Sequence, residues 1–192
     1  MDTKAELSKS ELRKKIKSRL AGIAAGQFSA AGSFAAQELK RIPGWDRYRS
    51  VLIFISKKDE MDTKPIMETI HAAGKSVFVP QINGDDLVFY RTEKGGSGQT
   101  GQGCLNHAPT LLPGDFPALV LTPGLAFDRS FNRLGRGRSY YDRFFSKLDE
   151  AGSDYTAVGL CMTCQLVEAV PADTWDKMLD MLLTENALVL PR

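Results

Sequence analysis

The chain has 192 residues, of which 43% are hydrophobic, and its formal net charge at pH 7 is only +2. This length and composition predict one globular domain over residues 1–192. The small net charge argues against general nucleic-acid binding, and no apolar run is long enough to cross a bilayer. The charged amino-terminal stretch lacks the apolar region of a secretory signal. We therefore expect a soluble cytoplasmic protein that requires no obligate protein partner.

The first predicted helix begins at Ser8, because Glu11 three residues later completes a capping box. Its buried stripe consists of apolar residues about one turn apart: Leu12, Ile16, Leu20 and Ile23. Lys9 and Arg13 are also one turn apart and project near the edge of this stripe. Either their stems cover the edge of the core, or both cations point toward an anion. The spacing permits both interpretations.

The rest of the chain alternates strand-like apolar runs with helical segments. Helices are predicted at about 29–41, from Thr63 and Pro65 to Gly74, and from about 140 to Gly152. Strands are predicted at 51–55, 76–79, 87–91, 119–122 and 156–160, with short runs at 180–185 and 188–190. The glycine-rich run 95–103 is a predicted loop. The alternation predicts a three-layer, Rossmann-like α/β fold, with helices on both faces of a mostly parallel sheet.

Residues 122–143 carry the strongest functional signal. An apolar strand leads into a loop that contains Gly135, Gly137 and four arginines, and this loop opens a helix whose first turn includes Asp142. The four arginines are Arg129, Arg133, Arg136 and Arg138. Glycines let backbone amides approach a ligand, a helix N-terminus adds partial positive charge, and arginine forks match phosphate oxygens. A carboxylate amid this positive charge is suited to hold a metal ion on phosphates. The segment therefore indicates a nucleotide-phosphate site.

Two other interpretations fit an arginine-rich loop. It can be a solvated turn, or a patch that grips RNA with a steep salt dependence and no need for magnesium. The segment also lacks the Gly-Lys-Ser/Thr of a Walker loop. Its position between an apolar strand and an amphipathic helix favours the phosphate site, because RNA-binding segments of this composition are disordered.

The same residues resemble a known family. Pro123–Asp128 and Asn132–Asp142 closely resemble the signature of the 5-formyltetrahydrofolate cyclo-ligases. Weaker matches extend over nearly the whole chain: Lys9, Arg13, residues 53–60, Gln165 and residues 180–185. The resemblance implies a single cyclo-ligase domain and an enzyme of one-carbon metabolism. Its expected reaction converts ATP and 5-formyltetrahydrofolate to 5,10-methenyltetrahydrofolate, ADP and phosphate, with Mg²⁺. The formyl oxygen attacks the γ-phosphate, and N10 then closes the ring as phosphate departs.

The resemblance also implies roles for individual residues. It assigns ATP binding to Lys9, Arg13, Arg133, Leu134, Gly135, Arg136, Gly137, Arg138, Ser139, Tyr140 and Tyr141. It assigns folate binding to Ile55, Glu60, Arg136, Gly137, Arg138, Ser139 and Tyr140. The implied catalytic residues are Arg136, Arg138 and Tyr141, and the implied magnesium ligands are Asp142 and Asp180. We expect the protein to bind neither nucleic acid nor a membrane.

Alternatives remain open at several of these positions. Tyr141 shares a helix face with aromatic residues and can be a core residue, and Glu60 can be an exposed acid in a charged loop. Ser139 replaces a glycine usual in the family, so a positive φ there would be strained. Asp142 lies in a first helical turn, and its replacement by Asn is expected to cost at most about 1 kcal/mol of stability. The whole chain can also be a relative that binds these ligands without turnover.

Overall fold

The computed structural model describes residues 7–92, 111 and 113–191. The predicted loop at 95–103 lies outside these residues. Four α-helices are described: α1 Lys9–Ala21, α2 Ala25–Glu38, α3 Lys64–Ala72 and α4 Tyr140–Glu150. No helix in the described part is long and apolar enough to cross a membrane.

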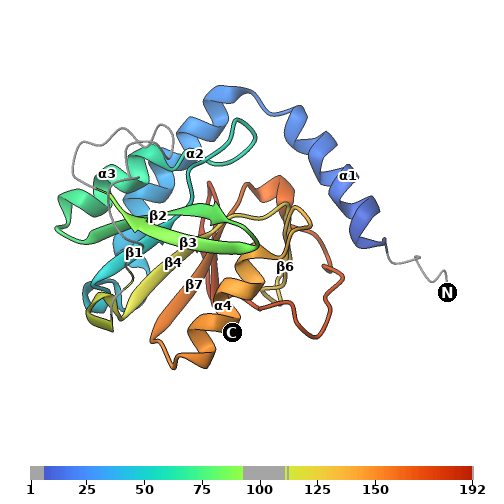
Figure 1. Ribbon diagram of the computed structural model, residues 1–192. Coiled ribbons are helices and arrows are strands. Elements are labelled where there is room, and N and C mark those ends of the chain that lie inside the picture. The colour runs from blue at the N-terminus through green and yellow to red at the C-terminus, as the bar shows by residue number, and fades with distance from the viewer. Residues whose placement is uncertain (1–6, 93–110, 112, 192) are drawn as a thin grey trace.

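A seven-stranded sheet forms the centre of the molecule (Figure 1). Its order is β3 (Asp86–Arg91), β2 (Ser76–Asn83), β1 (Ser50–Ile53), β4 (Ala118–Thr122), β7 (Tyr155–Leu160), β8 (Met181–Leu183) and β9 (Leu188–Val189). The five inner strands pair in parallel, and the edge strands β3 and β9 pair antiparallel to their neighbours. The predicted mostly parallel α/β sheet, with 87–91 at an edge, is therefore confirmed.

Both faces of the sheet are buried, and successive residues of a strand pack into different hydrophobic clusters. Val51 and Ile53 pack with residues of α1, α2 and α3, whereas Leu52 packs with the aromatic residues of α4. Helices thus cover both faces, with α2 and α3 on one side and α4 on the other (Figure 1). The uninterrupted hydrophobic runs in the sequence follow from this two-sided burial.

Helix α1 begins where the sequence predicted, and α2 begins earlier than predicted. Ser8 caps α1 and forms the predicted capping box with Glu11. Helix α2 begins at Ala25 rather than near Ser29, because Gln27 bonds back to the Ala24 N–H and closes the first turn. Its last turn continues as the 3₁₀ helix Leu39–Arg41.

Sequence patterns missed one element in the functional segment. A small antiparallel pair, β5 (Ala126–Phe127) and β6 (Arg133–Leu134), interrupts what was predicted as loop. Strands of two residues carry too little periodicity to be recognised. This hairpin fixes the backbone of Arg133, so part of the predicted loop has regular structure.

Helix α2 lies very close to the loop after β1. A Cβ atom on Gly32 would stand 2.0 Å from the Asp62 carbonyl oxygen, whereas one on Gly26 would meet nothing within 4 Å. The Asp62 N–H also donates to the Phe28 carbonyl at 3.1 Å. The absence of a side chain at position 32 is therefore a packing requirement.

These two glycines offer a matched stability test. Gly26→Ala should leave the free energy of unfolding unchanged or raise it by up to about 1 kcal/mol, because alanine favours the helix. Gly32→Ala should lower it by roughly 2 kcal/mol, because the added methyl overlaps fixed backbone. Urea denaturation of both variants measures the difference. Equal effects of the same sign would contradict the packing argument.

Candidate functional site

A cavity of about 540 Å³ opens where β1 and β4 end. Its apolar wall comes from the segment after β1 and from the β2–β3 hairpin: Phe54, Ile55, Pro80, Ile82 and Leu87. Its polar wall comes from the glycine- and arginine-rich segment: Arg133, Gly135, Arg136, Arg138, Ser139, Tyr140, Tyr141 and Asp142. Glu60 lines it as well. The fold thus brings most of the predicted site residues to one hollow at the carboxyl ends of parallel strands, the usual ligand position in such sheets.

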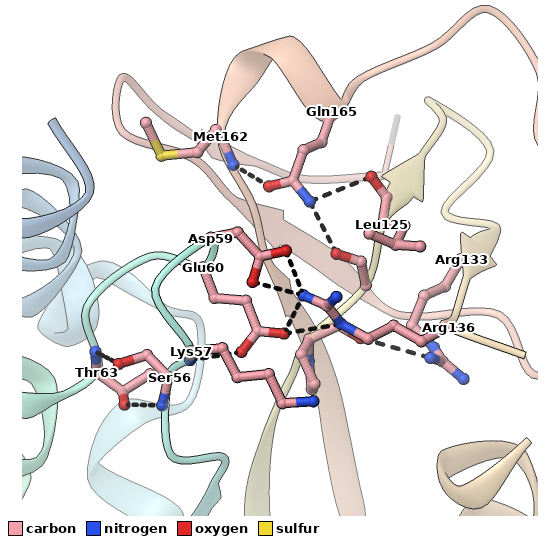
Figure 2. A network of polar contacts seen from close by, with 12 residues as sticks. Ser56, Lys57, Asp59, Glu60, Thr63, Leu125, Arg133, Arg136, Met162 and Gln165 are labelled. Atoms are coloured by element: carbon pink, nitrogen blue, oxygen red, sulfur yellow. Dashed lines mark hydrogen bonds and ion pairs between the residues drawn. The ribbon is translucent and has the colours of Figure 1, made fainter. Parts of the chain in front are cut away.

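Arg136 lines this cavity and bonds two carboxylates (Figure 2). Its Nη2 lies 2.9 and 3.0 Å from the two Asp59 oxygens and 2.9 Å from Glu60 Oε1, which also accepts from Nε at 3.2 Å. The second Glu60 oxygen accepts from the Lys57 N–H at 2.9 Å. We call Arg136, Asp59 and Glu60 the arginine clasp. It joins the loop after β1 to the arginine-rich segment.

A second arginine of the polar wall has a buried side chain. Arg133 and Asp142 form an ion pair of 2.8 Å in which their side chains are only 4% and 12% exposed. The Lys177 N–H also approaches Asp142 at 3.5 Å, and the Arg133 guanidinium lies over the Tyr141 ring at 5.5 Å. Asp142 therefore does more than favour a helix N-terminus. The expectation that Asn at this position would cost at most about 1 kcal/mol neglected this partner, and a larger loss of stability now follows.

Tyr141 combines the two interpretations that its sequence left open. Its ring packs in the core beside Phe145, at a centroid distance of 6.2 Å, and the residue also lines the cavity. Among the described residues, two buried polar atoms have no hydrogen-bond partner: Tyr141 Oη and Arg133 Nε. Burial raises the pKa of the Tyr141 phenol far above its usual value, so the hydroxyl stays protonated as a donor.

Ser139 has a positive φ, the case in which the sequence comparison expected strain at this position. It lies just before α4 with φ of +49°, in the left-handed region, and its side chain makes no capping bond. A residue with a Cβ pays roughly 1–2 kcal/mol there relative to glycine. Gly137 nearby has φ of +106°, which glycine adopts freely. The segment around the cavity thus contains local strain that the surrounding structure sustains.

Helix α1 reaches the arginine-rich segment through Arg13. Its Nε donates to the Gly135 carbonyl at 3.0 Å, so this cation lies behind the cavity wall. Lys9 forms ion pairs with Asp173, at 2.6 Å, and with Asp176. It lines a second hollow of about 860 Å³ between α1 and residues 166–173. Neither cation lines the first cavity, and their predicted contacts with ATP stay predictions.

Three further predicted residues also lie outside the cavity lining. Leu134, on β6, buries its side chain in the hydrophobic core, so only its backbone is available to a ligand. Gly137 is exposed beside the Arg13 guanidinium. Asp180 is exposed at the start of β8, where its carboxylate accepts from the Ala157 N–H at 2.7 Å. These observations locate the residues without testing their predicted roles.

Gln165 supports the segment after β4, which forms part of the cavity wall (Figure 2). Its side-chain amide donates to the Gly124 and Leu125 carbonyls at 2.8 and 3.2 Å, and its Oε1 accepts from the Met162 N–H at 2.8 Å. Gly124 itself lines the cavity. The resemblance included Gln165 without a role, and this buried amide fixes the chain after β4.

Two acidic residues lie in the segments that carry the resemblance, but the sequence assigned no role to either. Asp59 belongs to a run of charges in which nothing distinguishes it from its neighbours. Asp128 is buried and its carboxylate accepts four hydrogen bonds, from the N–H groups of Ser130, Asn132 and Val170 and from the Asn132 side chain. The spacing of Asp128 and Ser130 is a recognised signal of side-chain-capped turns. Asp128 thereby shapes the loop before β6.

The comparisons with known proteins agree with this geometry. The family model described as the 5-formyltetrahydrofolate cyclo-ligase family matches residues 5–185. The chain belongs to this family. A probable 5-formyltetrahydrofolate cyclo-ligase of Schizosaccharomyces pombe is 28% identical over 95% of this chain and 98% of its own length. The 5-formyltetrahydrofolate cyclo-ligase of Escherichia coli is 29% identical over 89% of this chain and 97% of its own length.

Solved structures of cyclo-ligases also resemble this one. The 5,10-methenyltetrahydrofolate synthetase of Aquifex aeolicus has a TM-score of 0.77 at 26% identity, over 96% of this chain and 93% of that one. A 5,10-methenyltetrahydrofolate synthetase of Mycoplasma pneumoniae, at 20% identity and a TM-score of 0.73, shares the fold over 92% of this chain and 98% of that one. The resemblance seen in the signature segment is confirmed, and the chain is an enzyme of the cyclo-ligase class.

The buried pair predicts a large stability effect in this cyclo-ligase. Asp142→Asn removes the partner of a buried guanidinium and should lower the free energy of unfolding by about 3 kcal/mol. Asp154→Asn is the control, because Asp154 pairs with Arg47 at an exposed site and should cost less than about 1 kcal/mol. Urea denaturation of both variants measures the contrast. A loss below about 1 kcal/mol for Asp142→Asn would contradict a desolvated pair.

The Tyr141 hydroxyl has no hydrogen-bond partner in the described structure, so its removal should not destabilise the protein. Tyr141→Phe should leave the free energy of unfolding unchanged or raise it, because the lost hydroxyl has no partner. Tyr48→Phe should lower it by about 1–2 kcal/mol, since the Tyr48 hydroxyl bonds to Thr156 Oγ1 at 2.9 Å and to the Pro43 carbonyl at 3.1 Å. Thermal and urea unfolding compare the two. A destabilised Tyr141→Phe variant would mean that the hydroxyl has a partner in solution.

Proposed function

We propose that this cyclo-ligase converts 5-formyltetrahydrofolate and ATP to 5,10-methenyltetrahydrofolate, ADP and phosphate, with Mg²⁺. The observation that carries the proposal is the two-sided cavity, in which an apolar wall faces an arginine- and glycine-rich wall. A flat pterin requires the first kind of surface and a polyphosphate the second. Both family membership and cavity composition support a site that takes the two substrates together.

The apolar side suits the folate. Ile55 and Leu87 can pack against the pterin ring, and Tyr140 provides an aromatic ring at the opposite wall. The Glu60 carboxylate can accept hydrogen bonds from pterin N–H groups. Its position in the lining, with only 10% of the side chain exposed, supports this role over that of a solvated acid.

The polar side suits the phosphates of ATP. Arg136 and Arg138 supply guanidinium groups, and the amino end of α4 adds backbone dipoles. Phosphoryl transfer depends on positioning and charge neutralisation rather than on covalent help from the protein. In the proposed reaction, these arginines orient the γ-phosphate toward the formyl oxygen and stabilise charge on the transferred group. The unpaired Tyr141 hydroxyl offers one more donor to a substrate oxygen.

Asp142 is the better supported of the two proposed magnesium ligands. It lines the cavity, and the Arg133 guanidinium bonds only its Oδ1. Asp180 lies outside the lining, and its proposed role rests on the resemblance alone. No group of three or more His, Cys, Asp or Glu side chains in the described ranges can hold a metal by itself. Magnesium commonly takes one or two carboxylates together with substrate phosphates, so it would enter with ATP and offset the phosphate charge.

The RNA-binding alternative receives little support from the same residues. Arg133 is buried, and Arg136 is paired with two carboxylates. Of the four arginines between 122 and 139, only Arg129 and Arg138 are exposed without a salt bridge among the described residues. An RNA-binding surface requires a row of free cations along the backbone.

Absorbance growth of methenyltetrahydrofolate tests the proposed reaction. Enzyme, ATP, Mg²⁺ and 5-formyltetrahydrofolate are mixed, and omission of ATP or Mg²⁺ should abolish product formation. Arg136→Met should lower kcat/KM by roughly 10²-fold, because one source of transition-state charge stabilisation is lost. Arg129→Met is the matched control: it removes the same charge from the same segment, but Arg129 does not line the cavity. A folded wild-type protein that forms no product would instead be a noncatalytic relative.

A further inference from the structure

The arginine clasp has an unusual balance of charge for a phosphate site. One guanidinium, 32% exposed, meets the carboxylates of Asp59 and Glu60, so the three side chains together carry a formal charge of −1. A polyphosphate that approaches Arg136 in this arrangement meets a net negative group. The clasp as it stands therefore disfavours the ligand that its arginine is proposed to bind.

Two members of the arginine clasp, Arg136 and Glu60, are also proposed to bind substrates. Arg136 is a proposed phosphate and folate ligand, and Glu60 is a proposed folate ligand. While they bond one another, neither is fully available to a substrate. Asp59 differs from both, because it holds the guanidinium from outside the cavity lining. Asp59 is not among the residues proposed to bind either substrate.

Arg136 is the member of the clasp that is freest to move. Glu60 stays attached to its own loop through the Lys57 N–H, and that loop is fixed to α2 by the Asp62 N–H. Arg136 stands between Gly135 and Gly137. Within the described part of the chain, its side chain bonds the two carboxylates of the clasp and no other group, so it is released from the loop after β1 once these bonds break. Opening of the clasp is thus a movement of the arginine away from a fixed pair of acids.

We propose that Asp59 is a positioning residue that withholds Arg136 from phosphate until the clasp opens, and that the clasp thereby couples the two substrates. The inference rests on the proposed function. Folate that engages Glu60 weakens the hold of this carboxylate on Arg136, and the released guanidinium then binds phosphate more tightly. By reciprocity, phosphate on Arg136 releases Glu60 for folate. Asp59 lowers the affinity for phosphate whether or not folate is bound, because it competes with phosphate for the same Arg136 donors.

Titration calorimetry with tripolyphosphate, in the absence of Mg²⁺, measures this coupling without turnover. The wild type, Asp59→Asn and Asp154→Asn are each titrated with and without saturating 5-formyltetrahydrofolate. In the wild type, folate should lower the Kd of tripolyphosphate by about 5-fold, near the lower limit of allosteric coupling because the clasp is partly exposed. In Asp59→Asn, the Kd without folate should already be lower by about 5-fold, and folate should lower it further by a similar factor, because Glu60 still bonds Arg136 in this variant. Asp154→Asn removes a charge beside the amino end of β7 and should match the wild type.

The outcomes separate this inference from the proposed function. If Asp59→Asn binds tripolyphosphate as well as or more weakly than the wild type, Asp59 does not withhold Arg136, and the inference fails even though the enzyme forms product. If folate leaves the Kd of the wild type unchanged, the coupling fails in the same way. A wild-type protein that binds neither ligand and forms no product would remove the proposed function and the inference together. The melting curve of Asp59→Asn, compared with that of Asp154→Asn, verifies that the fold is retained.

Discussion

The buried ion pair between Arg133 and Asp142 holds the candidate site together. One partner belongs to the short strand β6 and the other to the first turn of α4, so the pair fixes the two ends of the segment that carries Gly135 to Ser139. Removal of both charges from water is costly, and the pair persists because each charge supplies the partner that the other requires. The cavity wall, the aromatic contact of Tyr141 and the strained turn before α4 all lie within this short span.

Departures from ordinary local rules gather around the same cavity. Ser139 occupies a left-handed conformation, and Tyr141 Oη and Arg133 Nε are buried without partners in the described structure. Such features lower stability and persist where ligand binding gives them a use. One further departure lies away from the cavity lining, because Phe131, between β5 and β6, has a φ of +65°. The two hydrophobic clusters separate by strand face, and α1 begins with a complete capping box. The contrast supports the cavity as the functional part of the molecule.

Sequence patterns predicted the sheet, its helices and the position of the arginine-rich segment, because these depend on periodicity and on residues close together in the chain. They could not predict which charges would meet. Arg136 contacts Asp59 and Glu60 across the molecule, and Lys9 contacts Asp173 and Asp176 near the other end of the chain. Asp142 was expected to act through the helix dipole, and its partner became visible only when β6 placed Arg133 beside it. Such pairings are set by three-dimensional packing.

The close approach of α2 to the loop after β1 has a consequence for how variation is tolerated. Gly32 allows α2 to contact the backbone of Asp62 directly. The position of α2 relative to the sheet therefore determines the position of the loop that carries Glu60. A bulkier residue at this point displaces a carboxylate at the cavity mouth although it touches no ligand. An inspection confined to cavity-lining residues would classify position 32 as irrelevant to recognition. Libraries that vary substrate preference should therefore treat the small-residue face of α2 as part of the binding site.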